Sequence, residues 1–163
     1  MIRRTLLILG LLATAGLLAA AGLGYGLFGV TAETLRGHVL VSLAAVLVLL
    51  FSHCWIFLYL VATGRLIAEV VRERGMDAGL IGEAGRFRAR AVPWLLLAIG
   101  AALATFLLGG ASVAGSVPAW LHHGMFYLAL TVQVRALWIE RGVLADNERL
   151  MVNLGQRLAG DAA

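Results

Sequence analysis

The stretch from Thr5 to Val30, TLLILGLLATAGLLAAAGLGYGLFGV, decides the environment of this chain because its 26 residues include no charged side chain. As a helix rising about 1.5 Å per residue, it exceeds the roughly 30 Å of hydrocarbon in a bilayer. The apolar core of a cleaved signal peptide covers only about 7 to 15 residues. The stretch therefore predicts an uncleaved transmembrane helix, although Arg3 and Arg4 precede it as they would in a signal peptide.

The rest of the chain has the same apolar character. Of its 163 residues, 61% are hydrophobic and only 13% are charged, with a mean hydropathy of +0.93, which excludes a soluble domain. Three further apolar segments, residues 38–62, 91–110 and 118–138, are long enough to span a bilayer. We therefore predict an all-α membrane protein, a four-transmembrane-helix antiparallel bundle that forms a single domain over residues 1–163.

The arginines predict how the bundle is oriented. All 13 basic residues are arginines, and they flank the apolar segments, which indicates membrane topology rather than binding of nucleic acid. Arg36 alone lies on one predicted side of the membrane. Positive residues in short loops stay in the cytoplasm, so we predict an integral protein of the bacterial inner membrane with both termini cytoplasmic. The twelve arginines on the cytoplasmic side are Arg3, Arg4, Arg65, Arg72, Arg74, Arg86, Arg88, Arg90, Arg135, Arg141, Arg149 and Arg157.

Amphipathic segments lie beyond the predicted spans on the cytoplasmic side. Residues 64–75 place apolar and charged side chains on opposite faces, which predicts a helix ending at Gly75. Residues 79–90 combine glycines at every third position with a basic run, which indicates a mobile loop held at anionic headgroups. The C-terminal tail predicts a short separate helix. Thr31 is the expected N-cap of the second span, and Pro93 is expected in the first turn of the third.

Glycine motifs indicate packing rather than enzymatic chemistry. Residues 24–29 match the letters of a dinucleotide fingerprint, but they lie in an apolar span and not between a strand and a helix. Gly16, Ala20, Gly22 and Gly26 form a stripe of small residues, which predicts close helix contacts within the bundle, in a homo-oligomer or with a partner membrane subunit. The sequence carries no Walker loop, zinc-binding cysteine pair or serine elbow, so we do not expect an enzyme.

Histidines are the candidate functional residues. His38 and His53 lie in the second span, and His122 and His123 lie in the fourth. Ionisable groups inside a membrane are costly and are therefore candidates for function. His38, His122 and His123 all belong to the outer leaflet, on spans that run in the same direction. Because two imidazoles at similar depth can ligate one haem iron, the sequence predicts a b-type haem held by His38 with His122 or His123.

His53 fits this pair less well, because counting residues places it roughly 13 Å from His122 in depth. By the same count, His38 and His122 differ in depth by about 9 Å, and a tilt of the helices could absorb this difference. His53 is kept as a candidate cofactor ligand, although the fourth span offers no histidine at its level.

Three alternatives to haem binding remain open. His38, His122 and His123 could hold copper or another metal ion together with Met125. All four histidines could instead serve packing in a non-catalytic scaffold or accessory subunit that binds a partner or anionic lipid. A small transporter has less support, because broken helices and an intramembrane acid–base chain are missing. In plan, the predicted bundle is similar to haem-binding membrane anchors of respiratory enzymes and to membrane b-type cytochromes, which implies an electron-transfer module.

Overall fold

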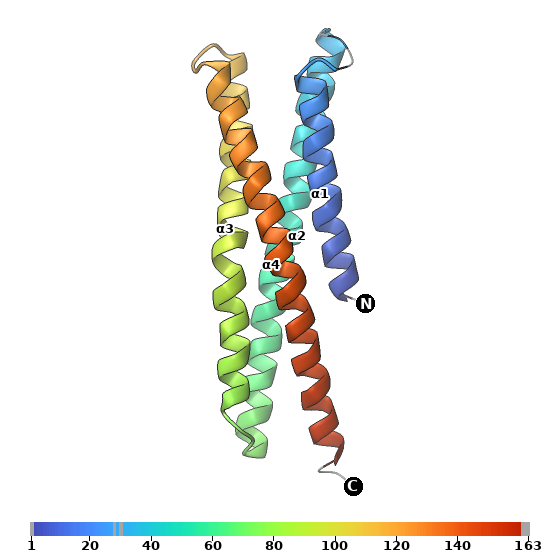
Figure 1. Cartoon of the computed structure of the whole chain (residues 1–163), viewed down its shortest axis with the longest axis vertical. Coiled ribbons are helices and arrows are strands. Elements are labelled where there is room, and N and C mark those ends of the chain that lie inside the picture. The colour runs from blue at the N-terminus through green and yellow to red at the C-terminus, as the bar shows by residue number, and fades with distance from the viewer. Residues whose placement is uncertain (1, 28, 30, 161–163) are drawn as a thin grey trace.

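The computed structural model describes residues 2–27, 29 and 31–160, and these residues form four helices and no strand. Consecutive helices run antiparallel (Figure 1), which confirms the predicted all-α antiparallel bundle. The helices are α1 (Ile2–Gly24), α2 (Ala32–Arg74), α3 (Gly79–Val113) and α4 (Ala119–Gly160). α1 therefore ends earlier than the first predicted span, whose residues 28 and 30 lie outside the described residues.

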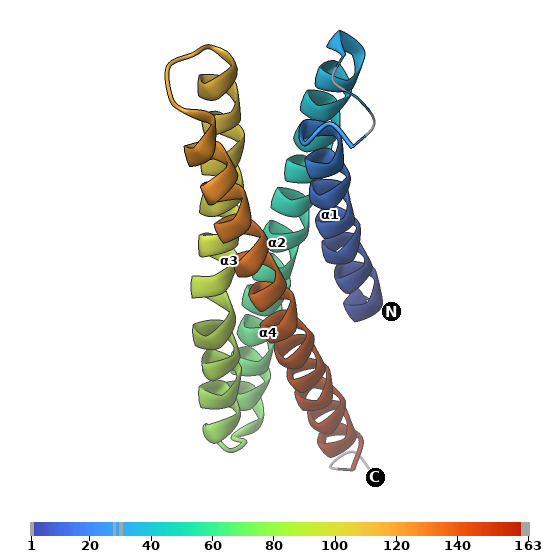
Figure 2. The same cartoon turned by 45° about the horizontal axis from the view of Figure 1, so that its top comes forward.

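α1 and α3 occupy opposite corners of the bundle. Each packs against both α2 and α4, whereas the backbones of α1 and α3 do not approach each other closely in the described part of the chain. α1 has 23 residues, but α2, α3 and α4 have 43, 35 and 42. The three longer helices therefore continue past the start of α1 (Figures 1 and 2). We call this extension, residues 64–90 and 149–160, the three-helix projection.

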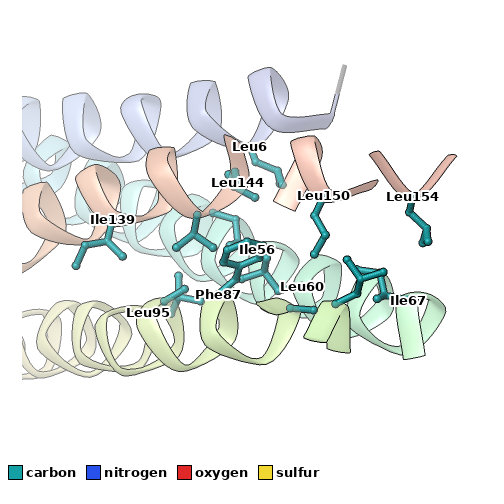
Figure 3. Close-up of a cluster of buried hydrophobic side chains, with 14 of the residues drawn as sticks. Leu6, Ile56, Leu60, Ile67, Phe87, Leu95, Ile139, Leu144, Leu150 and Leu154 are labelled. Atoms are coloured by element: carbon teal, nitrogen blue, oxygen red, sulfur yellow. The ribbon is translucent and has the colours of Figure 1, made fainter. Parts of the chain in front are cut away.

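Two large apolar cores hold the helices together, with a third cluster of Ala98, Val132 and Ala136 between α3 and α4. The larger core starts beside the first turns of α1 and runs into the three-helix projection (Figure 3). It includes Leu6, Ile56, Leu60, Phe87, Leu95, Ile139, Leu144, Leu150 and Leu154. The smaller core lies between α1, α2 and α3 and contains Ala13, Leu17, Ala45, Val46, Leu49 and Ala102.

Both predicted ends of α2 are confirmed. Thr31 is the N-cap: its hydroxyl accepts a hydrogen bond from the backbone N–H of Thr34, and the Thr34 hydroxyl accepts one from the backbone N–H of Thr31. Gly75 ends the helix with φ +62°, a left-handed conformation that glycine adopts without steric cost. The amphipathic segment 64–75 is thus a direct continuation of the second span.

Three predictions about segment boundaries are wrong. Residues 79–90 are the beginning of α3 and not a loop, because Leu80, Ala84, Phe87 and Ala91 form a buried stripe at helical spacing whose packing outweighs the glycines. For the same reason Pro93 lies inside α3 rather than in its first turn. The C-terminal tail is helical, as predicted, but it is not a short helix of its own, since α4 continues without a break to Gly160.

The apolar surface of the bundle agrees with a membrane environment. By length and composition, α1, α2 and α3 can each cross a bilayer. α4 is less apolar over its first half, because His122, His123, Gln133 and Arg135 interrupt it there. Large side chains face outward on the other three helices, as expected for contact with lipid; these include Leu11, Leu12, Leu18, Leu47, Phe51, Leu58, Leu96, Leu97 and Leu107.

Candidate cofactor site between two helical hairpins

The bundle consists of two similar helical hairpins, α1–α2 and α3–α4. α1 has five buried residues, and the residue 85 positions after each of them is buried in α3. Ala91, for example, lies 85 residues after Leu6. α1 and α3 run in the same direction, so the hairpins are related by an approximate two-fold axis along the bundle. The matching pairs are Leu6 and Ala91, Gly10 and Leu95, Ala13 and Ala98, Leu17 and Ala102, and Ala20 and Thr105.

In the first hairpin, His38 of α2 is held against α1. Its ring nitrogen Nδ1 lies 2.7 Å from the backbone carbonyl oxygen of Ala20. One turn further along α1 is Gly24, where a Cβ atom would lie 2.8 Å from the Cε1 atom of the His38 ring. The absence of a side chain at Gly24 therefore makes room for the imidazole.

The second hairpin repeats this arrangement. His122 of α4 occupies the place of His38, and its Nδ1 lies 3.0 Å from the carbonyl oxygen of Thr105 in α3. One turn along α3 is Gly109, where a Cβ atom would lie 3.0 Å from Cε1 of His122. Each hairpin thus contributes a half-site made of a histidine, a backbone carbonyl and a glycine four residues after that carbonyl.

The two carbonyls determine which ring nitrogens remain available. A carbonyl oxygen only accepts hydrogen bonds, so Nδ1 of His38 and Nδ1 of His122 must each carry the hydrogen. In a neutral imidazole the lone pair is then on Nε2. Metal-ligating histidines in proteins commonly have one ring N–H bound to a carbonyl in this way, which fixes the tautomer and the ring orientation.

The half-sites bring His38 and His122 together across the bundle. Their ring centroids are 6.3 Å apart and the ring planes are inclined by 84°. Two imidazoles on opposite sides of one metal ion, with bonds of about 2 Å, have centroids roughly 6 Å apart. The depth offset expected between these residues is therefore not present in the structure.

A cavity of about 340 Å³ opens beside the two rings. It lies where the α1–α2 and α3–α4 hairpins diverge, at the end opposite the three-helix projection (Figures 1 and 2). Its wall is mostly apolar and comes from all four helices. Besides the two histidines, the wall includes Leu17, Ala21, Val39, Phe106 and Phe126.

His123 lies at the rim and not between the hairpins. It is exposed, and its ring centroid is 5.0 Å from that of Tyr25 and 5.8 Å from that of His122. The hydroxyls of Tyr25 and Tyr127 are 3.1 Å apart and close the same rim. Burial and the hydrogen bond with Tyr127 raise the pKa of Tyr25, which follows the end of α1, to about 12.

The metal-ion alternative involved His38, His122, His123 and Met125. Within residues 2–27, 29 and 31–160, no three or more His, Cys, Asp or Glu side chains are grouped as they would be to hold a metal ion. Met125 is not among the residues that line the cavity.

His53 belongs to a different part of the bundle. It lies 15 residues, or about 22 Å of helix, from His38 along α2. Its Nε2 is 2.9 Å from Oε1 of Gln133, and its Nδ1 is 2.8 Å from Oε1 of Glu140. The structure therefore brings His38 and His122 together, places His123 beside them, and separates His53 from all three.

The stripe of small residues in α1 is only partly at a helix contact. At Gly16 a Cβ atom would lie 2.9 Å from Cβ of Ala45, and Ala20 is buried, so these residues allow α1 and α2 to approach closely. Gly26 lies in the turn after α1 with φ +71°, so it does not continue the stripe.

Several residues of the site were not predicted from the sequence, namely Ala20, Gly24, Thr105 and Gly109. The internal repeat of the two hairpins would have identified them in the sequence. Thr105 and Gly109 follow Ala20 and Gly24 by 85 residues, and His122 follows His38 by 84 residues. Comparison of the chain with models of protein families, with curated proteins and with solved structures gives no match.

Proposed function

We propose that this protein holds one b-type haem between His38 and His122 and transfers electrons through it. One observation carries the proposal: two imidazoles from different hairpins have their centroids 6.3 Å apart, and each has Nδ1 bound to a backbone carbonyl. The Nε2 atoms are therefore the nitrogens free to ligate a metal, and the separation of the ring centroids is close to that of two imidazoles bound to one ion.

The chemistry of the donor set favours haem over a bare metal ion. A porphyrin supplies four nitrogen ligands of its own, so two imidazoles complete the coordination of its iron. A bare transition-metal ion needs further protein ligands. Gly24 and Gly109 support the fit, because a side chain at either position would push a histidine ring from its place.

Haem, when bound, would supply one-electron chemistry. With two histidines of this chain holding the group, this chemistry would be transfer of electrons and not activation of a small molecule. The residues of this chain would hold and orient the group: the backbone carbonyls of Ala20 and Thr105 fix the two imidazoles, and Phe106 and Phe126 supply apolar surface to the cavity wall.

We further propose that α4 is the fourth membrane span and that both termini face the cytoplasm of a bacterial cell. α4 packs along α3 for much of its length and supplies His122 to a cavity whose other walls are spans. Twelve arginines lie at the N-terminus, in the three-helix projection or in α4, and this distribution supports the orientation.

Titration of the purified protein with haem tests the proposal. We expect saturation at one haem per chain, and no saturable binding to a His38→Ala/His122→Ala double variant. A stoichiometry of two, or equal binding by the double variant, would contradict the assignment.

The second candidate is a scaffold or accessory subunit, in a homo-oligomer or with another membrane protein. The three-helix projection supports it, because it carries Arg65, Arg72, Arg74, Arg86, Arg88 and Arg90 outside the apolar part of the bundle, where a partner or anionic lipid could bind. A protein that binds no haem but co-purifies with a partner or anionic lipid through this surface would favour this candidate.

A further inference from the structure

A second polar cluster lies deep in the bundle, well away from the proposed haem site. It consists of His53 of α2 with Gln133 and Glu140 of α4, and each of these residues has only 1% of its surface exposed. Burial of ionisable groups in a membrane bundle is costly, and such groups commonly mark pathways of ions or protons.

Hydrogen bonds indicate how protons are distributed in this cluster. Gln133 donates through Nε2 to the hydroxyl of Thr14, 3.4 Å away, so its Oε1 accepts from Nε2–H of His53. The other ring nitrogen, Nδ1, lies 2.8 Å from Oε1 of Glu140. The two atoms lie within ion-pair distance but without hydrogen-bond geometry. A proton bound by the pair can therefore be held in either of two arrangements: imidazolium with carboxylate, or imidazole with carboxylic acid.

The repeat indicates that apolar side chains can take the place of this cluster. In the other hairpin, the positions 84 residues away from His53, Gln133 and Glu140 are Leu137, Leu49 and Ile56, all apolar. Two other pairs of equivalent residues are polar in both hairpins, namely His38 with His122 and Thr63 with Asn147. Each residue of the cluster, in contrast, has an apolar equivalent in the other hairpin. Apolar side chains thus fill the equivalent space in the same protein.

A polar route leads from the cluster toward the three-helix projection. Two turns beyond Glu140 on the same face of α4 lies buried Asn147, whose Oδ1 accepts a hydrogen bond from the Thr63 hydroxyl at 3.2 Å. Four side-chain atoms are buried without a hydrogen-bond partner among the described residues: His53 Nδ1, Glu140 Oε1, Glu140 Oε2 and Asn147 Nδ2. Ordered water commonly satisfies such atoms.

The opposite direction is closed by apolar packing. Leu17, Val46, Leu49 and Ala102 form the smaller core between the cluster and the cavity. His53 contacts Gln133 and Glu140, and Gln133 in turn contacts Thr14. Within the described residues, α3 contributes no ionisable side chain to these contacts. The larger core also lies on the side of the projection, but Thr63 and Asn147 place polar groups within the bundle there, so we assign access to that side.

We propose that His53 and Glu140 form a proton-binding site inside the bundle, which exchanges its proton with the aqueous phase at the three-helix projection along Asn147 and Thr63. The site takes up a proton on the pair and releases it along the same route, because the apolar core closes the other side. This proposal does not depend on the binding of haem.

Infrared spectroscopy of the full-length protein in lipid nanodiscs tests the proposal. We expect a carboxylic-acid C=O band that changes between about pH 4 and pH 9, where buried carboxyl and imidazole groups titrate. The band should be absent in Glu140→Gln and retained in Glu148→Gln, whose carboxylate is exposed and pairs with Arg3. A pH-dependent band that survives in Glu140→Gln, or a wild-type protein without one, would overturn the proposal.

A second variant separates proton binding from a structural role. His53→Leu/Gln133→Leu/Glu140→Ile replaces the cluster by the residues of the other hairpin. Since well-packed apolar residues commonly replace a buried ion pair without loss of stability, this variant should melt at or above the wild-type temperature and lack the band. A large loss of stability would show that the cluster serves the fold and would contradict the proposal.

The rate at which the carboxylic-acid band responds to a change in pH tests the proposed route along Asn147 and Thr63. Asn147→Leu removes the amide between Glu140 and the projection, so the band should respond to a pH jump at least tenfold more slowly than in the wild type. An unchanged rate would contradict the assigned route.

Discussion

His38 and His122 are equivalent residues of two helical hairpins, with ring centroids 6.3 Å apart, and each binds a backbone carbonyl of the other helix in its own hairpin. Because the hairpins supply one half-site each, a ligand between the two rings lies close to the approximate two-fold axis of the bundle. The proposed haem therefore has two histidine ligands in closely similar surroundings.

The half-site glycines give the first prediction. Gly109→Ala should displace the His122 ring, because the new Cβ would lie 3.0 Å from Cε1, and should leave the protein about 1 kcal/mol less stable than Gly110→Ala. At the neighbouring Gly110 a Cβ would have no other group within 4 Å, so Gly110→Ala is the matched control. Thermal unfolding followed by circular dichroism compares the two, and equal melting temperatures would contradict the half-site at Gly109.

Contact between α1 and α2 gives the second prediction. Gly16→Leu should destabilise the bundle by about 1–3 kcal/mol, because a Cβ at Gly16 would already lie 2.9 Å from Cβ of Ala45. The adjacent Ala15 is exposed, so Ala15→Leu should leave stability nearly unchanged. If both variants unfold at the same temperature, α1 does not pack on α2 through Gly16.

Membrane topology gives the third prediction. After Cys54, an exposed cysteine, is replaced by serine, single cysteines are introduced at Ser116, between α3 and α4, and at Gln156, near the end of α4. An impermeant maleimide should label Ser116→Cys in intact cells and Gln156→Cys only after permeabilisation. Labelling of both positions from the same side would show that α4 does not cross the membrane.

Helix number and the ends of α2 follow from local sequence, and these features were predictable. Thr31 and Gly75 act on their own neighbours, so their types and positions suffice to indicate a helix start and a helix end. At residues 79–90 the prediction was wrong, since it relied on the glycines and overlooked the apolar stripe of Leu80, Ala84 and Phe87.

The candidate site was predictable only in its histidines. Ala20 and Thr105 contribute backbone carbonyls, which every residue has, so their side chains carry no signal of the role. The contact of His53 with Glu140 depends on the register of α2 against α4. That register follows from long-range packing, which residue counting along predicted spans does not reproduce.

The absorption spectrum of the purified protein, reduced and oxidised, tests the central claim most directly. For the wild type, expressed with sufficient haem, we predict a Soret band and, after reduction, the α and β bands of a six-coordinate b-type haem. His38→Ala and His122→Ala should each abolish or strongly alter these bands and to a similar extent, whereas His53→Ala and His123→Ala should retain them. A colourless wild-type protein, or bands that persist unchanged in both His38→Ala and His122→Ala, would contradict the claim.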